Sequence, residues 1–97
     1  MATSEQLIAL QQNMELETLP ELAGQINTAL ASAEALVLDG SAVRSIDAAS
    51  LQLLLATILA AREKSIHCHW REAAAPLRNA AARLGLTDEL SLTEKEQ

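Results

Sequence analysis

Residues 35–54 read ALVLDGSAVRSIDAASLQLL, and this stretch decides the fold class. The continuous apolar run at 35–38 is typical of a β-strand that is covered on both faces. The run ends in Asp-Gly-Ser at 39–41, a turn signal. Asp47 is then placed to cap a helix over 48–64. A strand that leads into a helix through a short loop predicts one half of a β-α-β unit.

The residues before this stretch predict two strands and a helix. Residues 7–10 are expected to form a first strand, and residues 13–17 a second, short one in which apolar and acidic side chains alternate. Thr18 is expected to cap the helix that follows, with Pro20 in the first turn and Glu21 completing a capping box.

The residues after the stretch predict a further strand and helix. Residues 66–71 alternate strictly, which is typical of a strand. One face would carry Ile66, Cys68 and Trp70, and the other His67, His69 and Arg71. A third helix opens at Pro76 and ends before Gly85, and the polar residues 88–97 are expected to fray or to form a short extra turn. The order β-β-α-β-α-β-α predicts an α/β fold: a mixed four-stranded sheet with its helices mainly on one face.

Length and composition restrict the classes of function. A chain of 97 residues with one cysteine fits a single domain, 1–97, without an internal disulfide. We expect its core to span about 6–92. The formal net charge of −6 argues against nucleic acid, whose phosphates require a basic surface. No segment approaches about 18 uninterrupted apolar residues, so we expect no direct membrane insertion, and the cytoplasm is the expected location.

The sequence shows no arrangement typical of catalysis or metal binding. A phosphate-binding glycine loop and a G-x-S-x-G nucleophile motif are both missing. His67 and His69 share one strand face, but two ligands do not complete a zinc site. We interpret them as polar residues on the less buried face of the sheet. The sequence therefore predicts no enzyme, no cofactor and no metal.

Residues 36–54 resemble the signature of STAS domains, the family of sulfate transporter and anti-sigma factor antagonist domains. That signature is an apolar strand ending in Asp-x-Ser, a short loop, and Ile-Asp-Ser/Thr-x-Gly-Leu at a helix start. Residues 77–86 are similar to the family's last helix, and the order of elements agrees. The resemblance implies a non-enzymatic regulatory module that binds a protein partner.

The chain departs from the signature at two positions. In anti-sigma factor antagonists, the residue after the helix-start Asp is a Ser or Thr that a partner kinase phosphorylates. Here that position is Ala48, which has no hydroxyl, and Ser50 stands where the family usually has Gly. Ser41, Ser45 and Ser50 are candidate substitute phosphoacceptors, with ordinary turn and helix-start roles as the alternative.

The resemblance places the partner-binding surface at the 39–47 loop and the helix 48–64. At ~100° per residue, the side of this helix away from the core carries small, weakly apolar residues, which would let a partner approach closely. The candidate partner-binding residues are Asp39, Ser41, Asp47, Ala48, Ala49, Ser50, Leu53, Ala56, Thr57 and Ala60. A face covered by the protein's own chain is the alternative.

Two classes of partner remain open at this point. One is an anti-sigma-factor-like kinase or a related switch protein. The other is the ATPase of a bacterial lipid-transport ABC complex, of which the chain would be the STAS subunit.

Overall fold

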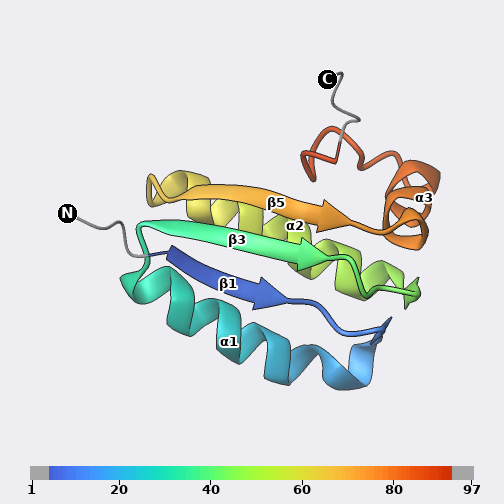
Figure 1. Ribbon diagram of the computed structural model, residues 1–97, viewed down its shortest axis with the longest axis horizontal. Helices are drawn as coiled ribbons and strands as arrows, with labels where there is room; N and C mark the ends of the chain where they lie inside the picture. The colour runs from blue at the N-terminus through green and yellow to red at the C-terminus, as the bar shows by residue number, and fades with distance from the viewer. Residues whose placement is uncertain (1–4, 93–97) are drawn as a thin grey trace.

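The computed structural model describes residues 5–92, and three parallel strands form the centre of the fold (Figure 1). The elements in chain order are β1 (Glu5–Ala9), β2 (Asn13–Met14), the 3-10 turn η1 (Leu16–Thr18), α1 (Leu19–Ser32), β3 (Ala35–Gly40), β4 (Ser45–Ile46), α2 (Ala48–Glu63), β5 (His67–Ala73) and α3 (Ala75–Arg83). The predicted alternation of strands and helices is therefore present.

The main sheet has the order β1-β3-β5, with every neighbouring pair parallel. Because the order advances in one direction and β-α-β crossovers are right-handed, both connecting helices must lie on the same face. Figure 1 shows α2 behind the sheet and α1 along its β1 edge, and the two helices are in contact. Leu36 and Leu38 of the central strand point into the core beneath these helices and are completely buried.

The prediction of one mixed four-stranded sheet is wrong. The strand β2 does not join the main sheet but forms a separate two-stranded parallel ladder with β4, in which Asn13 lies opposite Ser45 and Met14 opposite Ile46. The sequence between β1 and β2 contains no turn that would reverse the chain. The chain therefore keeps its direction, and β2 runs parallel to the segment that follows β3.

The beginning of α1 also differs from the expectation. Leu16 and Glu17, expected in the second strand, belong to η1, and Thr18 already has helical dihedral angles of φ −95° and ψ −3°. Its hydroxyl donates to the Glu15 carbonyl at 2.9 Å and caps no α1 backbone group. The predicted capping box between Thr18 and Glu21 is therefore wrong, because the turn before α1 is itself helical.

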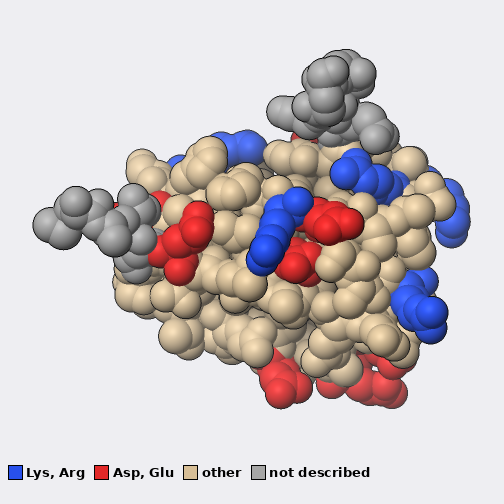
Figure 2. All heavy atoms as spheres, viewed as in Figure 1, with Lys and Arg blue, Asp and Glu red and all other residues tan. Residues whose placement is uncertain are grey.

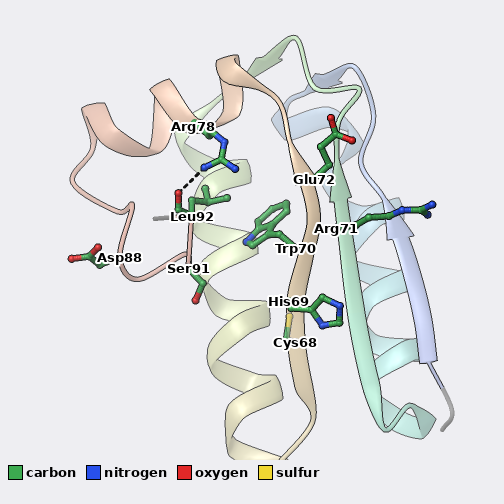
Figure 3. A pocket seen from close by; sticks show the side chains of 9 residues that line it. All are labelled: Cys68, His69, Trp70, Arg71, Glu72, Arg78, Asp88, Ser91 and Leu92. Atoms are coloured by element: carbon green, nitrogen blue, oxygen red, sulfur yellow. Dashed lines mark hydrogen bonds between the residues drawn. The ribbon is translucent and has the colours of Figure 1, made fainter. Parts of the chain in front are cut away.

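The segment after α3 packs against β5 rather than fraying at Asp88. Leu90 and Leu92 are buried in the core. The Trp70 indole donates to the Leu90 carbonyl at 2.8 Å, and the Arg78 guanidinium donates to the Leu92 carbonyl at 2.8 Å (Figure 3). The predicted short extra turn therefore exists as far as Leu92, and residues 93–97 lie outside the described part of the chain.

Two glycines should respond in opposite ways to replacement by alanine. A Cβ at Gly40 would lie 2.7 Å from Leu77 Cδ2 and 3.2 Å from Trp70 Cζ3, whereas a Cβ at Gly24 in α1 would meet nothing within 4 Å. We expect Gly40→Ala to lower the free energy of unfolding by about 1–3 kcal/mol through overpacking. We expect Gly24→Ala to raise it by roughly 0.5–1 kcal/mol through better helix propensity.

Urea denaturation of the two variants and the parent protein measures both effects. Loss of stability in Gly24→Ala, or none in Gly40→Ala, would contradict the packing around these positions.

Candidate partner-binding surface

Asp47 joins the start of α2 to the turn before α1. As the N-cap residue of α2, it accepts a hydrogen bond from the Ser50 backbone N–H at 2.8 Å through Oδ1. Its other oxygen, Oδ2, accepts one from the Leu16 backbone N–H at 3.0 Å. The hydrogen bond from the Ser50 backbone N–H, and then that from Leu16, lower the pKa of this carboxyl below its ordinary value. The predicted N-cap role of Asp47 is confirmed.

Asp39 organises the turn after β3. Its carboxylate accepts a hydrogen bond from the Ser41 backbone N–H at 3.0 Å. The hydrogen bonds from Ser41 lower the pKa of Asp39, and the positive charge of Arg71 acts in the same direction. Ser41 itself is exposed.

The candidate residues at the start of α2 differ widely in exposure. Ala48 is exposed, Ala49 is half-buried, and Ser50 is completely buried. The Ser50 hydroxyl has no hydrogen-bond partner within residues 5–92. Burial of this hydroxyl argues against Ser50 as a contact or a phosphoacceptor, and its expected role stays a prediction. Ser45 is exposed, and its hydroxyl donates to Asn13 Oδ1 at 2.9 Å.

The other candidate residues of α2 lie beside α1. Ala56 is exposed, whereas Leu53 and Ala60 are half-buried. Thr57 is only 2% exposed and its hydroxyl donates to the Leu53 carbonyl at 2.8 Å, which argues against a partner contact, and its expected role stays a prediction. A shallow groove of about 170 Å³ separates the two helices, and its lining residues are Ala23, Ile26, Asn27, Leu30, Leu53, Ala56, Thr57 and Ala60. The protein's own α1 thus covers one flank of the expected face.

The solvent side of α2 includes a leucine that the sequence analysis missed. Leu59 is 47% exposed, and Gln52 and Ala56 are exposed beside it at helical spacing. Because α2 has leucine, isoleucine or alanine around most of its circumference, its periodicity did not identify which leucines face solvent. Leu16, which is 65% exposed, was also missed, because the alternating pattern at 13–17 placed it on the apolar face of a predicted strand.

A hollow lies between β5 and the segment that follows α3. It measures about 560 Å³, and the residues lining it are Cys68, His69, Trp70, Arg71, Glu72, Arg78, Asp88, Ser91 and Leu92 (Figure 3). Arg78 binds the Ala73 and Leu92 carbonyls, which gives its guanidinium a role in holding the chain end. Burial raises the pKa of the Cys68 thiol, so this group is not an activated nucleophile.

His67 and His69 lie side by side on the open face of β5. Their ring centroids are 5.0 Å apart. Within residues 5–92 no three His, Cys, Asp or Glu side chains are grouped so as to hold a metal ion. The absence of a metal and of catalysis stays a prediction.

A family model described as "Mlab, STAS domain" matches residues 1–94. The comparisons with curated proteins and with solved structures yield no match. Within the described residues, no helix has the length and apolar character needed to cross a membrane.

Acid should destabilise the protein through Asp47 and Asp39. The pKa of each carboxyl is lowered in the folded protein from an ordinary value of 3.8, so its stabilisation is present above that value and is lost as pH falls through the folded pKa. We expect the free energy of unfolding to be level between pH 7 and about pH 5 and to decline at lower pH. Asp47→Asn retains one of the two acceptor oxygens but no titrating carboxyl at this position. The free energy of unfolding of this variant should therefore decline less steeply at low pH.

Urea denaturation at a series of pH values measures the effect. Glu63→Gln, which neutralises an exposed carboxylate at the other end of α2, is the matched control and should retain the parent profile. If the free energy of unfolding of Asp47→Asn declined at low pH as steeply as that of the parent, the role of Asp47 in acid destabilisation would be contradicted.

Proposed function

The chain belongs to the STAS domain family, and we propose that it is a non-catalytic docking subunit that binds one protein partner through the beginning and the solvent side of α2. The observation that carries the proposal is the composition of this helix. Residues 48–61 contain no charged side chain, although Ala48, Gln52, Ala56 and Leu59 are exposed. A helix face that remains in water usually carries charged residues, so a face without them is suited to a protein contact.

The proposed partner is the ATPase of a lipid-transport ABC complex. Release of a partner by phosphorylation requires a hydroxyl at the start of α2, but Ala48 has none and Ser50 is buried. A contact without such a control suits a permanent subunit of an assembly. The matching family model carries the name Mlab rather than that of an anti-sigma factor antagonist, which supports the same choice. This role would place the chain in the cytoplasm.

A switch protein with a kinase fold is the second candidate partner. The observation in its favour is the exposure of Ser41 and Ser45 in the loop before α2. A phosphate on either serine would add about −1.5 to −2 charges next to the proposed contact. In this case one of these serines would have replaced the acceptor that the family usually carries at position 48.

Introducing a charge at Ala48 tests the docking surface. We expect Ala48→Asp to weaken binding to the purified ATPase of the proposed ABC complex by at least tenfold, about 1.4 kcal/mol, because the contact must then bury a carboxylate. The fold should persist, because an acid in the first turn suits the helix dipole. Isothermal titration calorimetry measures the affinity, and circular dichroism measures the fold.

Ala75→Asp is the matched control, because Ala75 is likewise exposed at the first position of its helix, α3. This variant should bind as the parent does. Equal affinities of the parent and Ala48→Asp for the ATPase would rule out the proposed surface.

Intact-mass analysis of the protein isolated from its own cells distinguishes the two partner classes. We expect a single mass without added phosphate under all growth conditions. A regulated single phosphate that maps to Ser41 or Ser45 would instead favour the switch-protein candidate.

A further inference from the structure

The charge of this protein is distributed unevenly along the chain. Residues 1–43 contain six acidic residues and no Lys or Arg, whereas residues 44–97 contain seven acidic and seven basic residues. The whole net charge of −6 therefore comes from the first 43 residues. A surface built from this part of the chain should attract a basic partner surface.

Three of these acidic residues lie close together around η1. They are Glu15, Glu17 and Glu21, and all three are exposed. Figure 2 shows acidic side chains at the lower edge of the molecule, in the region where Figure 1 places the start of α1.

Leu16 lies between two of these glutamates and is 65% exposed, more than Leu7, Leu59 or Leu84. Its exposure does not come from a loose loop. Its backbone N–H donates to Asp47 Oδ2 at 3.0 Å, and the turn closes through a hydrogen bond from the Thr18 N–H to the Glu15 carbonyl at 2.9 Å. The leucine is thus held in one position on the surface, as a preorganised binding residue would be.

The same carboxylate links Leu16 to the beginning of α2. Asp47 binds the Leu16 N–H with one oxygen and caps α2 with the other, immediately before the exposed Ala48. Asp47 therefore links the backbone at Leu16 to the start of the proposed docking helix α2.

We propose that Leu16, together with Glu15, Glu17 and Glu21, forms a second contact for the partner, and we call this set the Leu16 patch. The leucine would enter a small apolar pocket of the partner, and Lys or Arg residues around that pocket would face the glutamates. An apolar side chain surrounded by charges of one sign fits such a pocket, because the centre of a contact is desolvated while its rim steers association. Asp47 is the positioning residue. The inference rests on the proposed function and names the chemistry of the partner surface.

Removing the leucine tests the apolar part of the contact. With the purified ATPase of the proposed ABC complex as the probe, we expect Leu16→Ala to weaken binding at least tenfold at every salt concentration. The matched control is Leu84→Ala, because Leu84 is 50% exposed at the end of α3. It should bind as the parent does, and both variants should retain the parent circular dichroism spectrum because neither side chain is buried.

Neutralising the glutamates tests the electrostatic part. We expect the double variant Glu15→Gln, Glu17→Gln to associate several-fold more slowly at low salt and to lose most of the salt dependence of the association rate. Glu89→Gln, an exposed carboxylate in the segment after α3, is the control and should retain the parent salt dependence.

The results separate this inference from the function on which it rests. Parent-like affinity in Leu16→Ala, or an unchanged salt dependence in the double variant, overturns the Leu16 patch even if Ala48→Asp weakens binding. A parent protein that does not bind the ATPase overturns both the patch and the proposed function.

Discussion

Asp47 holds together three segments that are far apart in the sequence. Its backbone N–H donates to the Met14 carbonyl at 3.0 Å, and its two carboxylate oxygens accept from Leu16 and Ser50. These bonds end the β2–β4 ladder, position η1 and begin α2. Each of them satisfies a backbone group that would otherwise lack a partner at an element end, so the surface around α2 depends on one side chain.

The second constraint on the fold is that the two β-α-β crossovers on either side of the buried strand β3 have the same hand. Because α1 and α2 must both lie on one face of the sheet, they pack beside each other and share a boundary. That boundary hides Thr57 and leaves Ala56 and Leu59 in solvent. The exposed part of α2 is therefore narrower than a helix wheel predicts.

The exposure of Ala48 and the burial of Ser50 help to interpret the two departures from the family signature. Ala48 is exposed and carries no functional group, while Ser50 contributes a small side chain to a fully buried position. The helix start keeps the cap that folding needs and lacks the chemistry that a phosphorylation switch needs. For this reason we favour a permanent docking role over a regulated one.

The sequence by itself determined a strand over the apolar run 35–38, the helix from Ala48 and the cap at Asp47, because apolar runs and cap chemistry act over a few neighbouring residues. It also indicated the family, through the residues around that cap. Only the tertiary structure decided that β2 pairs with β4, that Ser50 and Thr57 are buried, and that Leu16 and Leu59 are exposed. Those features depend on contacts between segments distant in the chain. The helix α2 is apolar on nearly every side, and the strand β2 has two residues in its ladder. The local sequence pattern of these two elements is therefore too weak to specify those contacts.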